Sequence, residues 1–367
     1  MEVHICELTL ELMKRNVKVE LAVCSAFGVA SGRREQLQRC GATFIDFPGH
    51  LRPSVLERIR STLRLLSVVN VDGFEAVVCH GVGLSHIFFA AKRRHTRLVW
   101  HDHLCGGDLA PCEDHFEAPV VRRYPWIFRK FLALADTVIT GSRQGVENLQ
   151  HIQLLKCPIV ELPPLSILPT SSERSTFRSE PLTCGVFGNL GPQKGTESLL
   201  RLWGRPELSS IRLVFFGKDP DSRYSRLSQK LALANVEFRG PYDSKEFHRH
   251  ADQVDFGIIS SVVEGYPIVA VELLACGIPF VTTKVGVCPE LCSGPATSGI
   301  VLVDQTDRAV LDGILEMVKR IRSGSVDRDA LRVRAKVAYD RSRSVEGYIR
   351  TIVPFEEKQR MQKAGSG

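Results

Sequence analysis

The chain has 367 residues, 44% of them hydrophobic and 24% charged, and its 48 Lys and Arg against 41 Asp and Glu leave a net charge of +7. These globular values exclude a fibrous or low-complexity chain, and the length suits two domains. No stretch approaches 18 consecutive apolar residues, and acidic Glu2, Glu7 and Glu11 do not fit a signal peptide. Eleven cysteines without a framework spacing favour reduced thiols in a cytoplasmic protein.

Short β-rich runs alternate with helix-length segments through the first half of the chain. A helix is expected from residue 2 onward, where a doubly wound domain normally opens with a buried strand, so we expect the first strand to be missing. Pro53–Val69 is a predicted helix because apolar residues recur on one face. Strands are predicted over 17–23, 74–79, 97–100 and 136–140. This alternation predicts a parallel sheet with helices on both faces.

A Pro- and Ser-rich stretch over 156–181 shows no helical or strand periodicity of apolar residues, and it interrupts this alternation. We take 161–181 as a linker between a domain at 1–160 and a second at 182–335. The charged stretch over 327–363 is predicted to be helical. Strands of the second domain are predicted over 183–187, 211–216, 254–259, 280–283 and 299–303. Two doubly wound α/β domains place the default ligand site in the cleft between them, at the carboxyl ends of strands.

The most informative segment is Ser260–Pro289, which reads SSVVEGYPIVAVELLACGIPFVTTKVGVCP. Glu264 follows a predicted strand, Gly265 permits close backbone approach, and Pro267 suits the first turn of a helix that contains Glu272. Free N–H groups at such a helix start can hold an anion, and flanking carboxylates accept hydrogen bonds from hydroxyls. The structural alternative is a strand, loop and helix with two solvated glutamates.

This segment resembles the retaining nucleotide-sugar glycosyltransferases of family 4, whose signature is Glu-x7-Glu in an EGFP…EAMACG context. Collinear matches over about residues 2–345 include CGVFGNLGPQKG at 184–195, DFGIIS at 255–260 and VWHDHLC at 99–105. The resemblance implies the α/β GT-B fold, two doubly wound Rossmann-like domains with a deep cleft between them. It makes the first domain the acceptor half and the second the nucleotide-sugar half, with 336–367 as a helix that crosses back to the first domain and then a tail.

The resemblance also implies roles for individual residues. Glu264 would lie near the donor sugar, Glu272 would bind the ribose hydroxyls, Lys194 would neutralise the diphosphate, and His101 would lie over the donor sugar. The implied catalytic residues are therefore Glu264, His101 and Lys194. Asn189 stands where the family usually has an arginine, which weakens leaving-group stabilisation. The implied donor-binding residues are Gly188, Asn189, Lys194, Gly265, Tyr266, Pro267, Ile268, Val269 and Glu272.

Two patterns suggest metals. A zinc site is an alternative interpretation of His101, His103, Cys105, Cys112 and His115, although their spacing matches no standard ligand pattern. Asp219-Pro220-Asp221 matches a bare Asp-x-Asp, but the proline after a predicted strand favours a turn. The resemblance implies no metal and no other cofactor, with the nucleoside diphosphate sugar as co-substrate.

We therefore predict a retaining, metal-independent hexosyltransferase that passes a sugar from a nucleoside diphosphate sugar to a glycan, lipid-linked or small-molecule acceptor. The basic and aromatic stretch at 120–134, with Lys92–Arg94, suggests peripheral contact with an anionic membrane at its inner face, against a surface helix packed on the core. No nucleic-acid motif accompanies these charges. The alternatives are a non-catalytic GT-B protein or partner subunit that binds a nucleotide sugar or glycan without turnover, and an epimerase or phosphorylase.

Overall fold

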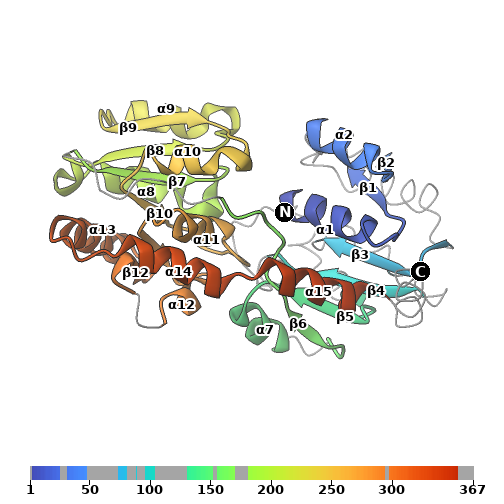
Figure 1. Ribbon diagram of the computed structural model, residues 1–367. Helices are drawn as coiled ribbons and strands as arrows, with labels where there is room; N and C mark the ends of the chain where they lie inside the picture. Colours follow the sequence, from blue (N-terminus) through green and yellow to red (C-terminus); the bar gives the residue numbers. More distant parts are fainter. Residues whose placement is uncertain are drawn as a thin grey trace. The chain divides into compact units, whose positions relative to one another are not determined.

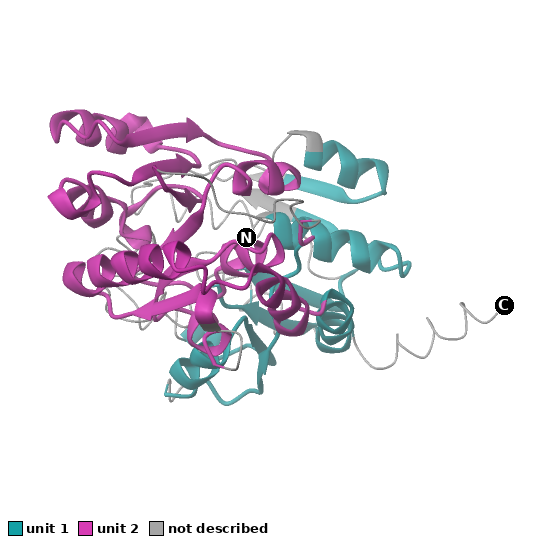
Figure 2. Ribbon diagram, turned by 60° about the vertical axis from the view of Figure 1, so that its left-hand side comes forward, with its two compact units in different colours: residues 1–166, 341–367 teal, residues 167–340 magenta. Residues whose placement is uncertain are grey.

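The computed structural model divides the chain into two compact units, which Figure 2 colours separately. Unit 1 consists of residues 1–166 and 341–367, and unit 2 of residues 167–340. The structure describes residues 2–24, 31–47, 73–80, 88, 96–103, 130–151, 155–169, 181–293 and 297–353. The predicted helix over 53–69, the cluster Lys92–Arg94 and most of the basic stretch at 120–134 lie outside these residues.

Unit 1 contains two parallel sheets. The larger has the order β3-β4-β5-β6, and β1 pairs with β2 in the smaller one (Figure 1). The strands are β1 (Glu20–Cys24), β2 (Thr43–Phe47), β3 (Ala76–His80), β4 (Arg97–His101), β5 (Thr137–Thr140) and β6 (Ile159–Glu161). The described helices are α1 (Glu2–Met13), α2 (Ser31–Arg39), α7 (Arg143–Gln150) and α15 (Arg341–Ile352). The register pairs His80 with His101, so these two residues lie side by side at the carboxyl ends of β3 and β4.

Helix α15 completes the core of unit 1 although it comes last in the chain (Figure 1). Its apolar residues Val345, Tyr348 and Ile349 join a buried cluster with residues of α1 and β4. At its start, Arg341 donates to Glu7 at 2.8 Å and to Glu11 at 3.0 Å, both on α1. The core of this unit therefore joins α1 and α15, which lie far apart in the sequence, to the strands between them.

Unit 2 contains one six-stranded parallel sheet in the order β12-β11-β10-β7-β8-β9. The strands are β7 (Thr183–Phe187), β8 (Arg212–Phe216), β9 (Val236–Gly240), β10 (Phe256–Ile259), β11 (Phe280–Thr283) and β12 (Ile300–Val303). Read in chain order this is 3-2-1-4-5-6, the order of dinucleotide-binding domains. The order reverses between β7 and β10, which makes the carboxyl ends of these two strands the switch point of the sheet.

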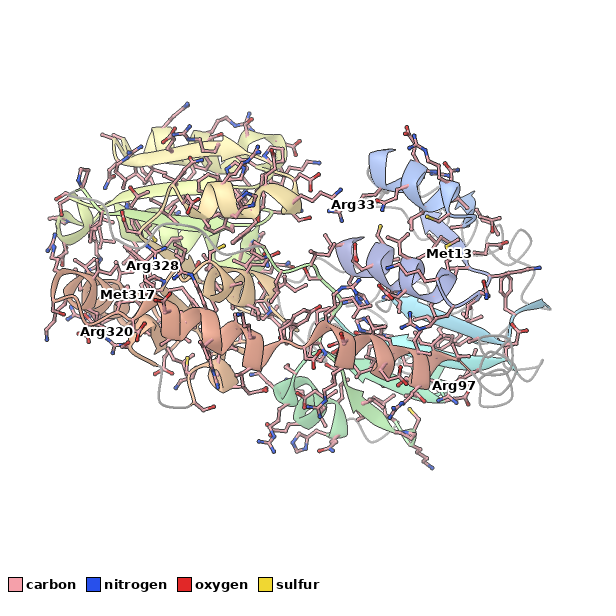
Figure 3. The ribbon with its side chains drawn as sticks, viewed as in Figure 1. Met13, Arg33, Arg97, Met317, Arg320 and Arg328 are labelled. Carbon is pink, nitrogen blue, oxygen red and sulfur yellow. The ribbon has the colours of Figure 1, made fainter. Side chains whose placement is uncertain are left out.

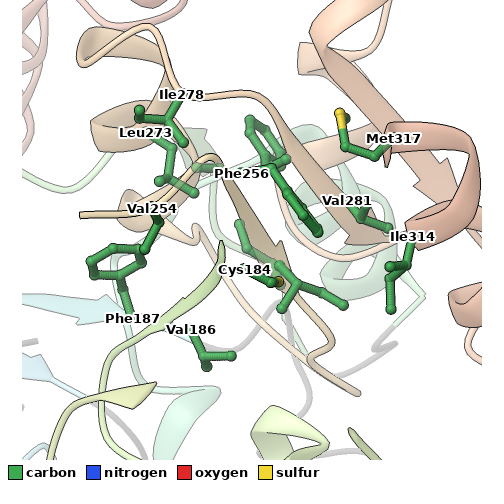
Figure 4. Packing of buried hydrophobic residues seen from close by; sticks show 14 of the residues in the cluster. Cys184, Val186, Phe187, Val254, Phe256, Leu273, Ile278, Val281, Ile314 and Met317 are labelled. Carbon is green, nitrogen blue, oxygen red and sulfur yellow. The ribbon is translucent and has the colours of Figure 1, made fainter. Parts of the chain in front are cut away.

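The described helices of unit 2 are α8 (Thr196–Trp203), α9 (Arg223–Lys230), α10 (Phe247–Ala251), α11 (Ile268–Ala275), α12 (Cys288–Leu291), α13 (Asp307–Arg322) and α14 (Arg328–Ala338). Figure 4 shows Phe256, Leu273, Val281 and Met317 packed in its core, all fully or almost fully buried. Arg320 of α13, labelled in Figure 3, donates to the carbonyl of Ile300 at the start of β12. Apolar burial therefore fixes the sheet whose edge carries the loops described below.

Comparison with the sequence-based predictions shows close agreement for most strands. The structure begins the first strand at Glu20 rather than Val17 and adds β2, β6 and β9, which the pattern had not identified as strands. The predicted terminal helix is two helices, because Tyr339 adopts an extended conformation between them. The described cysteine side chains form no disulfide. Within the described residues we find no helix with both the length and the apolarity needed to cross a membrane.

Candidate active site

The turn after β7 lies against the end of β10. Gly195, with φ of 66°, ends a short 3-10 turn and begins α8, and a Cβ atom there would meet the carbonyl oxygen of Ser260 at 2.2 Å. The Ser260 hydroxyl donates to the carbonyl of Lys194 at 2.9 Å, and the amide of Val262 donates to Gln193 at 2.8 Å. These contacts fix the position of Lys194 relative to the loop that contains Glu264.

Lys194 and Glu264 form an ion pair at this point, although 70 residues separate them in the sequence. The Ser261 hydroxyl donates to the same carboxylate at 2.8 Å. The Lys194 side chain is 29% exposed and that of Glu264 only 11%, so the pair is shielded but within reach of a ligand. A partly buried ammonium and a carboxylate that already accepts hydrogen bonds can recognise a phosphate and a hydroxyl, respectively.

The loop from Gly265 to Pro267 leads directly into α11. Gly286, with φ of 52°, lies against this loop, because a Cβ atom there would meet the Gly265 carbonyl at 2.7 Å and the Pro267 ring at 2.8 Å. Ile268 and Val269 form the first turn of α11, and no side chain caps this helix start. Tyr266 is mostly buried next to the core of unit 2. The predicted donor-binding residues from Gly265 to Val269 therefore form one continuous segment that leads into the N-terminus of a helix.

Glu272 is a buried carboxyl group inside α11, with 6% of its surface exposed. Burial alone raises its pKa from 4.5 to about 8. Burial also raises the pKa of the Tyr242 phenol, and the negative charge of ionised Glu272 raises it further. The carboxyl group is therefore mostly protonated at neutral pH without a ligand, and hydrogen-bond donors from a ligand would favour its ionised form.

Gly188 and Asn189 lie between β7 and the turn. The amide of Gly188 donates to the Phe216 carbonyl at 2.8 Å, which holds the end of β7 against β8. Gly217 must be glycine, because its φ is 158° and a Cβ atom would lie 1.8 Å from the Gly188 carbonyl oxygen. Asn189 is exposed, so its amide is accessible at the position where an arginine is usual in the resembling family.

Unit 1 carries a separate group of histidines at the carboxyl ends of β3 and β4. His103 Nε2 lies 3.0 Å from His80 Nδ1 and 2.8 Å from His101 Nδ1. His101 Nε2 lies 2.8 Å from the hydroxyl of Tyr348 on α15. The ring of His4, on α1, stacks on that of His101 with 4.7 Å between centroids. We refer to His4, His80, His101 and His103 as the histidine cluster.

Burial keeps the histidine cluster neutral. It lowers the pKa of His80 to about 3 and those of His4, His101 and His103 well below 6.5, with repulsion between neighbouring rings as a further cause at His4, His101 and His103. His101 is 1% exposed, and both of its ring nitrogens contact protein atoms. A contact between His101 and a donor sugar therefore requires the ring to exchange one of these partners.

Sequence reasoning singled out His101 and His103 but not His4, His80 or Tyr348. One signal was present, because the segments VVCH and LVWH each end a strand in histidine and neighbouring parallel strands present their ends together. Tyr348 had no such signal, since 247 residues separate it from His101. Cys105, Cys112 and His115 of the zinc interpretation lie outside the described residues.

The Asp-x-Asp pattern is a turn, as predicted. Asp219 accepts hydrogen bonds from the amides of Tyr224 at 3.0 Å and Ser225 at 2.9 Å, at the start of α9. Asp221 lies inside the turn with φ of 53°. The Asp219 carboxylate therefore caps a helix, and its oxygens are already occupied by protein donors.

Comparisons with known proteins agree with this architecture. The family model described as Glycosyltransferase Family 4 matches residues 1–164, and the model described as Glycosyl transferases group 1 matches residues 181–320. The first model matches 164 residues and the second 140, so together they match 304 of the 367 residues.

Curated relatives are distant. The chain is 28% identical to a D-inositol 3-phosphate glycosyltransferase of Corynebacterium jeikeium over 196 residues, 47% of this chain and 46% of the relative. It is 22% identical to a subunit of the human phosphatidylinositol N-acetylglucosaminyltransferase over 338 residues, 89% of this chain and 66% of the relative. The chain thus spans about half to two thirds of these relatives' length.

Solved structures establish the fold. Sucrose-phosphate synthase of Thermosynechococcus elongatus matches with a TM-score of 0.68 at 14% identity, covering 95% of this chain and 100% of that one. The Anabaena protein HepE in complex with UDP and glucose also matches with a TM-score of 0.68, at 15% identity and 95% coverage of both chains. The parallel α/β architecture of the two units is that of the GT-B fold.

Proposed function

The chain belongs to glycosyltransferase family 4, and on that premise we propose that it transfers a sugar from a nucleoside diphosphate sugar to an acceptor hydroxyl with retention of configuration. The observation that carries this function is the pairing of Lys194 with Glu264 where the strand order reverses between β7 and β10. A phosphate-binding cation and a hydroxyl-binding carboxylate are thereby held together at the place where α/β domains bind nucleotides.

In this function unit 2 binds the donor. Lys194 exchanges Glu264 for the diphosphate, and Glu264 then accepts hydrogen bonds from the sugar hydroxyls. Glu272 accepts hydrogen bonds from the ribose hydroxyls. The backbone amides from Gly265 to Val269 meet the sugar and phosphate at the start of α11. On the opposite side of the donor, Gly188 allows the donor to approach the backbone closely, and Asn189 donates a hydrogen bond to it from its side-chain amide.

The acceptor oxygen attacks the anomeric carbon from the face that the diphosphate leaves, so one C–O bond forms as the other breaks. The acceptor proton passes to the departing diphosphate oxygen, and no enzyme nucleophile is consumed. Lys194 and the α11 amides stabilise the leaving group, which is how we account for a hexosyl transfer without a metal. His101 meets the donor sugar after exchanging its contact with His103.

Unit 1 is the acceptor half in this proposal. Two relatives are named for transfer involving inositol 3-phosphate and phosphatidylinositol, so a phosphorylated polyol, free or lipid-linked, is the first acceptor to test. A non-catalytic protein that binds a nucleotide sugar is the second candidate, and exposed Asn189 in place of a phosphate-binding arginine favours it. Release of free nucleotide from the donor separates the two, since only the enzyme produces it.

We expect one nucleoside diphosphate to stabilise the protein clearly more than others. Thermal unfolding with UDP, GDP and ADP measures this, and a ligand at 100 times its Kd adds about 2.7 kcal/mol to the free energy of unfolding. UDP is expected to give the largest shift, because the structurally similar HepE was solved with UDP. If no nucleotide changes the unfolding temperature, unit 2 does not bind a donor and the proposal is wrong.

Nucleotide affinity is expected to depend on pH through Glu272. The folded carboxyl has a pKa of about 8, and ribose hydroxyls bind its ionised form. Affinity should therefore rise about tenfold from pH 6 to 7, about fivefold from pH 7 to 8, and level off above pH 8. Isothermal titration with UDP at several pH values checks this slope.

The matched variant is Glu272→Gln, which keeps an oxygen that accepts hydrogen bonds from hydroxyl groups but cannot ionise. Its UDP affinity should be lower at pH 8 and constant across the same range. Without ligand, the raised pKa means that the wild-type protein loses stability as the pH rises from 4.5 through 8, and the variant should lack that loss. An unchanged slope in the variant would assign the pH dependence to another group.

A further inference from the structure

The histidine cluster of unit 1 presents several ring nitrogens to one another rather than to separate partners. His103 Nε2 contacts His80 Nδ1 and His101 Nδ1 at the same time, at 3.0 and 2.8 Å. One ring nitrogen from each of His4, His80 and His101 lies within 4.8 Å of the others. Neutral imidazoles in a protein interior ordinarily bond to carbonyls, carboxylates or water, so this arrangement requires an explanation.

Counting protons shows that the arrangement is incomplete. Tyr348 donates its single hydroxyl proton to the Leu162 carbonyl, and it must therefore accept the Nε2 proton of His101. His101 Nδ1 consequently carries a lone pair and no proton. His103 Nε2 can carry only one proton, yet it faces this lone pair and His80 Nδ1 together. A proton on His80 Nδ1 would either face the Nε2 proton of His103 or leave the lone pairs of His103 and His101 facing each other. No neutral tautomer therefore makes both short contacts good hydrogen bonds, whereas a bound cation would satisfy all three nitrogens.

The surroundings already fix the groups that such a cation needs. The Tyr348 hydroxyl holds His101 in the tautomer whose Nδ1 faces His103, as a supporting partner does for a metal-bound histidine. His4 Nδ1 accepts the amide proton of Leu165 at 2.8 Å, so its Nε2 carries the remaining proton. This N–H is buried and has no hydrogen-bond partner among the described residues. Water or an anion bound to the cation would accept it.

We propose that the histidine cluster is a binding site for a divalent transition-metal ion, with His80 Nδ1, His101 Nδ1 and His103 Nε2 as its ligands. Imidazole ligands suit Zn²⁺, Co²⁺, Ni²⁺ and Cu²⁺ rather than Mg²⁺ or Ca²⁺. Three histidines leave one coordination position open, which faces the His4 N–H in our assignment. Ligands of a tetrahedral site lie about 3.3 Å apart, so His103 Nε2 needs to move only a few tenths of an ångström from each of the other two nitrogens.

Metal binding has a consequence for the proposed function, on which this second step rests. A metal on His101 Nδ1 and a hydrogen bond from His101 Nε2 to Tyr348 occupy both ring nitrogens. His101 then cannot turn to a donor sugar. The metal should therefore inhibit transfer, and chelation should restore it.

The test uses the full chain, freed of metal with a chelator and titrated with Co²⁺. We expect one Co²⁺ per chain by elemental analysis after gel filtration, together with the visible absorption bands of a four- or five-coordinate ion. His80→Ala and His103→Ala should each lower the affinity at least 100-fold. The control His151→Ala removes an exposed histidine outside the cluster and should bind Co²⁺ like the wild type.

A milder variant keeps the test decisive if the alanine variants unfold. Tyr348→Phe keeps the buried ring and removes only the hydroxyl that orients His101, so it should weaken Co²⁺ binding about 10- to 100-fold. Absence of stoichiometric Co²⁺ from the wild type, or full binding by the folded His80 and His103 variants, overturns the metal site. UDP binding without Co²⁺ binding rejects this inference alone, whereas Co²⁺ binding without nucleotide binding rejects the proposed function alone.

Discussion

Glu264→Gln is expected to lower the rate of sugar transfer about 10²- to 10³-fold, which corresponds to about 2.7–4 kcal/mol of transition-state stabilisation. The substitution keeps the size of the side chain and an oxygen that accepts from the Ser261 hydroxyl. It removes the negative charge that pairs with Lys194 and, in our proposal, faces the donor sugar. Steady-state kinetics with a UDP-sugar and release of free UDP measure the effect.

Glu237→Gln is the matched control for this prediction. Glu237 also forms ion pairs, with Arg212 and Arg239, but it lies on the exposed surface of β9. Surface ion pairs contribute little, so the control should keep wild-type rates and stability. UDP affinity should be kept or increase in Glu264→Gln, because the diphosphate no longer has to displace this carboxylate from Lys194. Wild-type rates of both donor hydrolysis and transfer in Glu264→Gln would remove Glu264 from the proposed mechanism.

Lys194→Met is expected to reduce transfer at least as strongly and to weaken UDP binding as well. Methionine fills a similar volume without the charge that would neutralise the diphosphate, both in the bound donor and as the leaving group departs. The variant also leaves the carboxylate of Glu264, whose side chain is only 11% exposed, without its cation. We therefore expect a lower free energy of unfolding, which thermal unfolding at pH 7 measures.

Two further variants separate charge from folding at this position. Lys194→Arg retains the charge but lengthens the side chain, and it should recover UDP affinity better than it recovers kcat. Lys230→Met removes an exposed lysine of α9 and should behave as the wild type. If Lys194→Met binds UDP with wild-type affinity, another cation neutralises the diphosphate and the role assigned to Lys194 is wrong.

The sequence predicted unit 2 better than unit 1 for a physical reason. Several strands of unit 2 are short apolar runs such as Phe256–Ile259, buried on both faces, and the loop and helix after that strand carry the Glu-x7-Glu pattern within nine consecutive residues. Lys194 and Glu264 were each identified from local sequence, but their direct pairing follows from the meeting of β7 and β10, which only the strand order determines.

The histidine cluster could not be predicted in the same way. Its members lie on α1, on β3, on β4 and just after β4, and the tyrosine that orients His101 comes from α15. No local period brings residues 4 and 348 together, because their proximity depends on which helices pack on the sheet. Strand β9 was also missed, since its residues are only partly buried apart from exposed Arg239 and show no clear alternation.

The placement of α15 in unit 1 also determines the order in which the chain can fold. All residues of unit 2 leave the ribosome before Arg341–Ile352 does, whereas unit 1 lacks part of its core until that helix has been made. The core of unit 1 is therefore expected to be completed after unit 2 has been made, and Tyr348 reaches His101 only after that point. A chain that stops at residue 340 would retain the whole of unit 2 and leave the apolar face of α1 and β4 exposed, so truncation at this end should cause aggregation of the first half of the protein.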